Sequence, residues 1–419
     1  MSSGPSVGAR PRSFAALHHR GYRVFFIGTA AAMLADNVEH VISYWMLFQK
    51  FHSESLQGFA VISHWLPFLL FSAYVGALAD RFDPRRMIQL GMLLFMGVSI
   101  AWGVMFVSGT LTKSGAMALL IVHGVAGVLW NPTSQLLLHD IVEPEDLPSA
   151  VRLNATARSL GILLGPALGA GLLLTLGPAR GIFVNALIYL PMTLWLWKAP
   201  YGPRFRVGGV AARAVVRGFG DILATFRTIA QQPVLLSMTL LAGAASAFIG
   251  NGYQAQMPEF ARDLGHGDPS VAYAMLLAAD AAGALTGGFV LESRGLLRAS
   301  PRAALVLAVL WCGALGGFAL TRVYPLAVVL LFAAGFLELS CSAMTQTLVQ
   351  LNAPAPLRGH VIGVFSMASL GLRMFAGITV GVIGSVIGIH HSLALSALFL
   401  LLAVVVIARR RSPGQLQLS

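Results

Sequence analysis

The stretch YRVFFIGTAAAMLADNVEHVISYWMLFQ, residues 22–49, decides the fold because it is long enough to cross a bilayer yet carries polar groups at its centre. On a helix, Asp36, Glu39 and His40 stand at i, i+3 and i+4 and therefore share one face. A charged side chain at the centre of a membrane helix costs about 2.5–3.5 kcal/mol on insertion scales, so these groups need water, partners or protons. We expect this face to line a polar cavity. A buried hydrogen-bonded cluster that only fixes helix packing is the alternative.

The composition predicts an integral membrane protein. Hydrophobic residues make up 57% of the 419 positions and charged residues only 11%, whereas charged residues approach a quarter of a soluble domain. The net charge of +12 does not indicate a nucleic-acid binder, because the arginines lie between apolar runs instead of on one face of a domain. Cys312 and Cys341 lie inside apolar runs without metal-ligand spacing, so we expect neither a disulfide nor a zinc site.

Apolar runs bounded by charges, Gly or Pro predict twelve membrane spans and hence an all-α membrane protein. Both termini then lie on one side of the membrane, and most of the 28 lysines and arginines fall in loops on that side, which predicts cytoplasmic termini in an inner (plasma) membrane. The first 21 residues have no apolar core, so we expect no cleaved signal peptide. The predicted spans are 22–49, 57–79, 87–108, 115–139, 149–176, 180–198, 234–260, 269–291, 302–321, 324–349, 359–387 and 391–408.

The longest break between spans divides the chain into two halves of six spans. We therefore expect a bundle at 1–198, a linker at 199–232 and a second bundle at 233–419. An offset of 210 residues aligns Ser159, Leu160 and Gly161 with Ser369, Leu370 and Gly371, which indicates a weak internal repeat. An amphipathic helix on the inner membrane face is predicted in the linker, where apolar residues recur at steps of three and four, namely Val215, Phe219, Ile222, Phe226 and Ile229.

The loop after the second span carries a charged motif. Its residues are Gly76, Leu78, Asp80, Arg81, Asp83, Arg85 and Arg86. This loop resembles the signature loop of the major facilitator superfamily, although Asp83 and Pro84 replace the usual Gly and first basic residue. The resemblance implies a fold of two pseudo-symmetric six-helix bundles. It also implies a conformational switch in which Gly76 permits close helix approach and Asp80 forms a charge network with Arg81, Arg85 and Arg86.

A second motif lies in the fifth span. Gly161, Gly165, Pro166 and Gly169 resemble the motif of proton-coupled exporters in that superfamily and are candidates for the same conformational switch. With Asn154, Arg158, Phe183 and Asn185, the region is similar to the branch of transmembrane secretion effectors that includes enterobactin exporters and macrolide efflux proteins. A generic packing face of small residues is the alternative.

His123 lies in the fourth span where exporters of the superfamily commonly place an Arg. Unlike Arg, a histidine releases its proton near neutral pH. We therefore predict that Asp36, Glu39, His40 and His123 handle protons; a core histidine bonded to a backbone group remains the alternative for His123. Metal binding by Asp36, Glu39, His40, His64 and His123 is not favoured, because the sequence has neither a His pair at fixed helical spacing nor a Cys cluster.

The resemblance implies that the first, fourth, seventh and tenth spans line the substrate cavity, and polar residues gather in these spans. The predicted cavity residues are Asn37, Trp130, Asn131, Gln135, Asn251, Tyr253, Gln254, Glu338 and Gln346. Three charged residues of flanking spans are predicted buried partners of Glu39 or Glu338, namely Arg158, Asp280 and Arg373.

No enzyme motif is present. Lys50, Lys113 and Lys198 do not lie in a phosphate-binding loop, and no nucleophile elbow occurs, so neither catalysis nor a cofactor is expected. We predict a monomeric secondary transporter that exports a small amphipathic organic compound in exchange for protons by alternating access. The alternatives are a proton-coupled importer, a metal-ion transporter, and a membrane sensor or lipid-handling protein without coupled flux.

Overall fold

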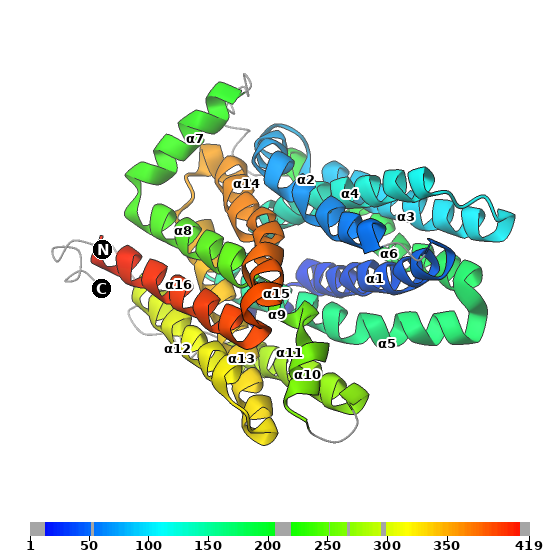
Figure 1. Ribbon diagram of the computed structural model, residues 1–419. Helices are drawn as coiled ribbons and strands as arrows, with labels where there is room; N and C mark the ends of the chain where they lie inside the picture. Colours follow the sequence, from blue (N-terminus) through cyan, green and yellow to red (C-terminus); the bar gives the residue numbers. More distant parts are fainter. Residues whose placement is uncertain are drawn as a thin grey trace, which may run out of the picture.

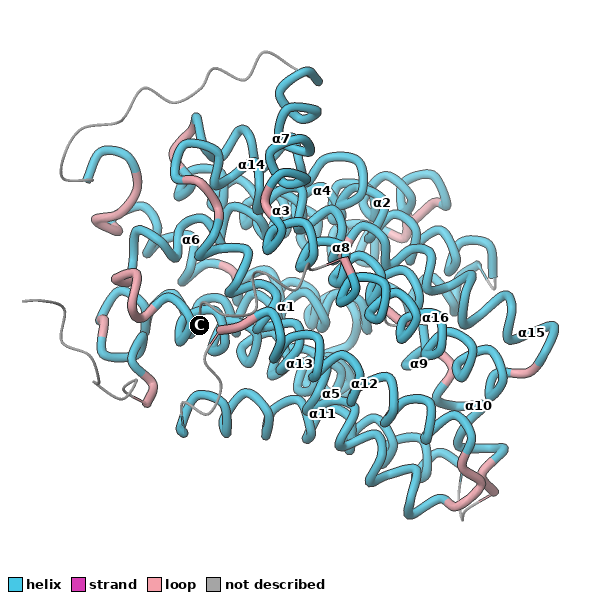
Figure 2. Tube along the Cα trace, turned by 90° about the vertical axis from the view of Figure 1, so that its left-hand side faces the viewer, coloured by secondary structure: helices cyan, strands magenta, loops and turns pink. Residues whose placement is uncertain are grey.

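The computed structural model describes residues 13–51, 54–205, 219–250, 252–265, 269–294 and 299–410. In these ranges the chain forms helices joined by short loops, without a strand (Figures 1 and 2). The first half contains six helices, which are α1 (Arg20–Phe51), α2 (Glu54–Arg81), α3 (Pro84–Ser108), α4 (Lys113–Ile141), α5 (Leu147–Ile188) and α6 (Leu190–Lys198).

A turn at Gly177 divides the long helical stretch of α5 and α6. Gly177 has a φ of 76°, a left-handed conformation that glycine adopts without a steric penalty. The stretch Leu147–Lys198 spans 52 residues, so it holds two membrane crossings separated by this turn. The separate spans predicted at 149–176 and 180–198 agree with this division.

The second half is more irregular than the first. Its helices are α8 (Pro233–Phe248), α9 (Gly252–Ala255), α10 (Met257–Asp263), α11 (Pro269–Arg294), α12 (Pro301–Leu320), α13 (Tyr324–Asn352), α14 (Arg358–Ser369), α15 (Ile383–Ile387) and α16 (Ile389–Arg409). Two spans predicted as continuous, 234–260 and 359–387, are broken. The first breaks near Gly250, whose φ is 43°, and the second passes through a 3₁₀ turn at Gly371–Phe375 and a π-helical segment at Gly377–Val382.

Ten helical stretches of the described chain are long and apolar enough to cross a membrane. The stretch Leu147–Lys198 counts among them as one but holds two crossings, and α1, with 32 residues and a polar centre, supplies the twelfth. Large apolar side chains on the outside of the molecule are widely exposed, such as Leu174 at 84% and Val386 at 80%. Such an apolar outer surface suits contact with lipid.

The two halves meet most closely where α2 runs beside α14 (Figure 1). A side chain at Gly76 would reach within 2.6 Å of the Gly363 Cα and would collide with the Gly359 carbonyl, so the two backbones touch without intervening side chains. On α11, Gly288 packs closely against the side chain of Thr156 of α5. Both contacts lie toward the side on which α1 begins and α16 ends, which we call the terminal side.

A short helix, α7 (Phe219–Gln231), occupies the end of the linker, as the spacing of apolar residues predicted. Val215, part of the predicted pattern, lies outside the described residues. Ile229 is buried, whereas Phe226 remains 39% exposed. The helix contacts α8, α14 and α2 and thus lies beside the terminal side of both halves.

Candidate functional site

Three helices bring acidic and imidazole side chains together near the middle of the first half. Oδ1 of Asp36, on α1, lies 2.9 Å from Nε2 of His123, on α4. His40 lies one helical turn beyond Asp36, with 3.9 Å between its Nδ1 and Asp36 Oδ2. The ring of His64, on α2, packs edge-on against His40 at 4.9 Å between centroids. We call Asp36, Glu39, His40, His64 and His123 the imidazole cluster.

Glu39 forms the buried side of this cluster. Its side chain is only 2% exposed, and its Oε1 accepts a hydrogen bond from Nδ1 of His123 at 2.8 Å. The other carboxylate oxygen accepts a hydrogen bond from the Ser99 hydroxyl of α3, and Asn185 of α5 donates to Ser99 at 3.2 Å. Both oxygens of this buried carboxylate are therefore satisfied, which offsets much of the cost of burying it.

A cavity of about 330 Å³ opens beside the imidazole cluster. Asp36 and His40 line it, and their side chains remain 12% and 21% exposed. Aromatic and charged groups make up much of the rest of the wall. They include Tyr44, Trp65, Phe68, Phe95, Trp130, Arg158 and Arg373. The cavity thus combines apolar ring faces with ionisable groups, an arrangement suited to an amphipathic solute.

The second half buries a different acidic group. The Tyr253 hydroxyl lies 3.1 Å from each carboxylate oxygen of Asp280 and 3.5 Å from Oε2 of Glu338. Gln254 donates a second hydrogen bond to Asp280 at 2.9 Å. We call Tyr253, Gln254, Asp280 and Glu338 the phenol cluster. Since the phenol carries one proton, it donates to one carboxylate oxygen at a time.

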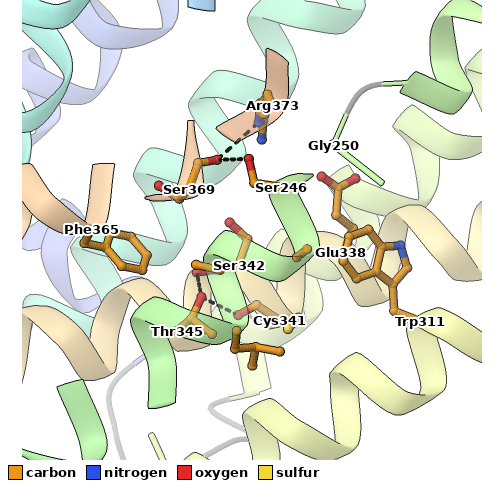
Figure 3. A pocket seen from close by; sticks show the side chains of 13 residues that line it. Ser246, Gly250, Trp311, Glu338, Cys341, Ser342, Thr345, Phe365, Ser369 and Arg373 are labelled. Atoms are coloured by element: carbon orange, nitrogen blue, oxygen red, sulfur yellow. Dashed lines mark hydrogen bonds between the residues drawn. The ribbon is translucent and has the colours of Figure 1, made fainter. Parts of the chain in front are cut away.

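Glu338 also lines a smaller cavity of about 50 Å³ within the second half (Figure 3). Arg373 enters this cavity from the 3₁₀ turn and donates a hydrogen bond to the Ser369 carbonyl, which Ser246 also binds. The Arg373 guanidinium lies 5.2 Å from the centre of the Trp65 ring, so it reaches across to the first half. Arg158 and Arg373 both interact electrostatically with Glu338.

The loop after α2 differs from the predicted charge network. Asp80 accepts hydrogen bonds from the backbone N–H groups of Gly359 and His360 at 2.8 and 3.0 Å, and its Oδ2 lies 2.7 Å from the His360 ring. It therefore caps the first turn of α14, where free backbone N–H groups and the helix dipole favour a carboxylate. Asp83, not Asp80, is the partner of Arg85, at 2.7 Å.

The remaining arginines of the loop also have local partners. Arg85 donates to the Ala199 carbonyl and so anchors the start of the linker. Arg86 binds Gln89 at 2.7 Å and lies over the ring of Trp197. Arg81 lies over Phe82. These contacts hold the loop within the first half, and Asp80 alone among the motif's charged residues reaches the second half through the hydrogen bonds described here.

A matching contact lies on the same terminal side, where α11 meets α5. Glu292, near the end of α11, accepts a hydrogen bond from Arg152 Nε at 2.8 Å and another from the Ser149 hydroxyl, both at the start of α5. Each half therefore contributes one buried carboxylate that binds the beginning of a helix in the opposite half. We call the Asp80 and Glu292 contacts the two latches.

The glycines of α5 pack against α1 directly behind the imidazole cluster. A side chain at Gly161 would meet Met33, and one at Gly169 would meet Val41. At Gly165, an added Cβ would collide with the Cβ of Asn37. Pro166 is exposed on the outside of this contact. The geometry supports the packing alternative for these glycines and places them where they position α1.

The structure brings together some of the predicted cavity residues and separates others. Asn37, Trp130, Asn131 and Gln254 line the cavity beside the imidazole cluster. Gln135 and Gln346 line a small adjoining crevice toward the terminal side. Tyr253 does not reach a cavity, because its side chain is fully buried in the phenol cluster. Asn251 lies outside the described residues.

Of the two partners left open for the buried arginines, Glu39 is instead paired with His123 and Ser99, whereas Glu338 interacts electrostatically with Arg158 and Arg373. Asp280 is bound by Tyr253 and Gln254. Sequence reasoning missed Ser99 as a partner of Glu39 and gave His64 no favoured role. Both Ser99 and His64 could have been recognised from the sequence, because each is a polar residue in an otherwise apolar helix.

Comparison with known proteins agrees with this architecture. A model of the family described as transmembrane secretion effector matches residues 11–416. The multidrug efflux pump Tap of Mycolicibacterium fortuitum is 24% identical over 401 residues, covering 93% of this chain and 95% of that protein. The staphyloferrin A transporter of Staphylococcus aureus is 22% identical over 187 residues, covering 42% and 47%. The structure of the human organic anion transporter MFSD10 (TETRAN) superimposes with a TM-score of 0.72 at 16% identity, covering 93% and 99%.

Proposed function

Because the chain belongs to the transmembrane secretion effector family of major facilitator transporters, we propose that it exports a small amphipathic organic compound in exchange for protons. The observation that carries the proposal is the place of Asp36 and His40, which line a cavity between the halves while contacting buried groups behind them. Ionisable groups within a membrane protein mark ion and substrate pathways more often than they serve packing alone.

The contacts within the imidazole cluster support a route for the proton. Asp36 and His40 exchange protons with water in the cavity. His123 contacts Asp36 through Nε2 and Glu39 through Nδ1, so the imidazole links the cavity wall to the buried carboxylate. A ring that accepts a proton on one nitrogen and releases one from the other passes charge without moving its backbone. Protons on Asp36 and His40 then compete with substrate for the same cavity wall.

The two latches support transport by alternating access. In this conformation Asp80 and Glu292 hold the terminal side closed. Opening that side requires both carboxylates to leave their helix N-terminal partners, so the latches separate two discrete states. Arg158, Arg373 and Glu338 lie near the boundary between the halves, and we assign them electrostatic roles in the same transition.

The cavity and the relatives together support a substrate class. One relative is named as a multidrug efflux pump and another as a staphyloferrin A transporter. The aromatic rings of Trp65, Phe68 and Trp130 favour a ring system or an apolar chain, and Arg158 and Arg373 favour an acidic group. We therefore propose a drug-like or siderophore-like compound. The excess of arginines on the terminal side supports cytoplasmic termini in the inner membrane. We further propose that the protein acts as a monomer.

Transport in reconstituted vesicles with an imposed pH gradient tests the proposal. Ethidium and a citrate-type siderophore serve as probes of the drug-like and siderophore-like classes. We expect the probe to move in the direction opposite to the protons. We expect the Asp36→Asn variant to remain folded but to show no transport driven by the pH gradient. Movement of the probe with the protons would indicate an importer. If the Asp36→Asn variant still transports the probe in response to the pH gradient, the imidazole cluster does not handle protons.

A further inference from the structure

Four side chains of the imidazole cluster converge on one point. Asp36 and His40 come from α1, His64 from α2 and His123 from α4, and one potential ligand atom from each lies within 4.8 Å of all the others. Tetrahedral ligands around Zn²⁺, with bonds of about 2.0–2.1 Å, lie roughly 3.3 Å from one another. Small rotations of these side chains therefore bring three nitrogens and one oxygen to ligand distances.

His123 has the arrangement of a metal-binding histidine. Its Nδ1 donates to the Glu39 carboxylate, which directs the lone pair of the neutral ring to Nε2. Nε2 is buried and makes no aligned hydrogen bond, although its ion-pair partner Asp36 Oδ1 lies 2.9 Å away. A carboxylate on one ring nitrogen, with the other nitrogen facing a second potential ligand atom, is the arrangement of a metal ligand with its supporting residue.

His64 provides an unpartnered imidazole. Its Nδ1 is buried without a hydrogen-bond partner, although the side chain lies on the cavity wall. Leaving polar atoms unpaired in a low-dielectric interior is costly, so each such atom needs an explanation. A ligand shared by His64 and His123 satisfies both.

We propose that Asp36, His40, His64 and His123 bind one divalent transition-metal ion that enters from the cavity. Imidazole nitrogens with one carboxylate suit Zn²⁺, Co²⁺ or Fe²⁺, whereas Mg²⁺ and Ca²⁺ require mostly oxygen ligands. The two carboxylates of Asp36 and Glu39 balance the charge of such an ion when the imidazoles are neutral. Arg158 and Arg373 line the same cavity and oppose a cation, so this balance is needed.

The ion and the protons of the proposed exchange compete for the same lone pairs, because metal ligands must be deprotonated. The metal site nevertheless does not depend on that exchange. Binding of an ion is measured without any transport, and the site stands on the arrangement of four side chains. Loss of metal binding and loss of gradient-driven flux are therefore separate results.

Titration of the full-length protein with Co²⁺ tests the site. The protein is purified in detergent with an affinity tag other than oligohistidine, and the visible absorption of Co²⁺ reports its coordination. We expect the intense bands of tetrahedral Co²⁺ at one ion per chain, displaced by Zn²⁺ and not by excess Mg²⁺. Absence of these bands, or displacement by Mg²⁺, would overturn the proposal.

Variants separate this site from chance binding at the surface. His64→Gln removes a ligand that has no other partner, and we expect affinity to fall at least about tenfold. Glu39→Gln removes the supporting carboxylate and should weaken binding by about 10- to 100-fold. His391→Gln, on the exposed part of α16, is the matched control and should bind as the wild type does. Equal affinity in His64→Gln and His391→Gln, with both proteins folded by circular dichroism, would contradict the proposal.

Discussion

The imidazole cluster of the first half and the phenol cluster of the second half solve the same problem with different chemistry. Each holds two carboxylates near the middle of the molecule; Asp36, Glu39 and Asp280 are buried, and Glu338 is half-buried on a cavity wall. Asp36 and Glu39 are held by imidazoles, whose reference pKa is about 6.5, whereas Asp280 is held by a phenol, whose reference pKa is about 10, and by an amide. Only the first arrangement contains imidazoles, the side chains whose reference pKa lies near neutral pH.

The two latches, unlike the two clusters, are similar in the two halves. Asp80 of the first half binds the start of α14, and Glu292 of the second half binds the start of α5. Closure is therefore shared between the halves, while the imidazoles that we propose to handle protons lie in one of them. We therefore propose that the first half responds to protons and that both halves move during transport.

The largest expected effect is that of Glu39→Gln. The amide cannot accept the charge-assisted bonds of His123 and Ser99 in the same way, and breaking a buried charged pair costs about 3 kcal/mol or more. Gradient-driven transport in vesicles should fall by roughly a hundredfold. Asp280→Asn is the matched variant of the second half and should retain a pH-dependent rate. If Asp280→Asn loses gradient coupling while Glu39→Gln keeps it, the comparison between the clusters is reversed.

Asp80→Asn is expected to have the next largest effect, on the equilibrium between conformations. The variant loses the charge in two backbone hydrogen bonds and the contact with His360, and bonds to charged groups contribute about 1.5–3 kcal/mol each. We expect a shift of about tenfold toward a parted terminal side. Double electron–electron resonance between spin labels at Glu145 and Asn352 measures it.

Glu292→Gln provides the symmetry control for this measurement. Its loss leaves Arg152 without its carboxylate partner, so the same direction of shift is expected. If Asp80→Asn and Glu292→Gln shift the distance between the spin labels in opposite directions, closure is not shared between the halves.

A smaller effect is expected for Tyr253→Phe. The change removes one hydroxyl, while Gln254 still binds Asp280 at 2.9 Å. A cost near 1 kcal/mol corresponds to roughly a fivefold change in rate, without a change in the pH at which transport is half-maximal. Transport measured across a range of pH checks both quantities. A displaced pH profile would assign proton sensing to the second half as well.

The smallest effect is expected for Pro166→Ala. Pro166 lies on the exposed side of α5, and the chain position 210 residues later is Ala376, so the change makes the first half resemble the second. The change also restores the backbone hydrogen bond that a helix-interior proline lacks, which stabilises α5, but it removes no contact of the site, so we expect the rate to change by roughly twofold or less. Export of ethidium by cells measures this directly. Loss of export would restore a switching role to the proline and weaken the packing explanation.

The membrane spans were predictable from sequence because apolar length is a local property. The shared face of Asp36, Glu39 and His40 was predictable for the same reason, since helical spacing fixes it. Partners across helices were not. Asp80 binds a residue 279 positions away, and Ser99 is one small polar residue in an apolar helix until Glu39 is placed beside it.

The irregular spans show the same limit. Glycines at 250, 371 and 377 weaken a helix, but glycines at 161, 165 and 169 leave α5 continuous. Close packing does not separate the two sets, because Gly371 packs against Leu69 of α2 as closely as Gly161 packs against Met33 of α1. Local helix propensity therefore does not decide where a membrane helix breaks.

The contact between Gly76, Gly359 and Gly363 has a practical consequence. Because two backbones touch there without side chains between them, a single added methyl group acts as a wedge. Gly76→Ala would hold the terminal side apart while leaving the cavity chemistry untouched. One carbon atom at this position thus offers a means of trapping the opposite conformation for crystallisation or electron microscopy.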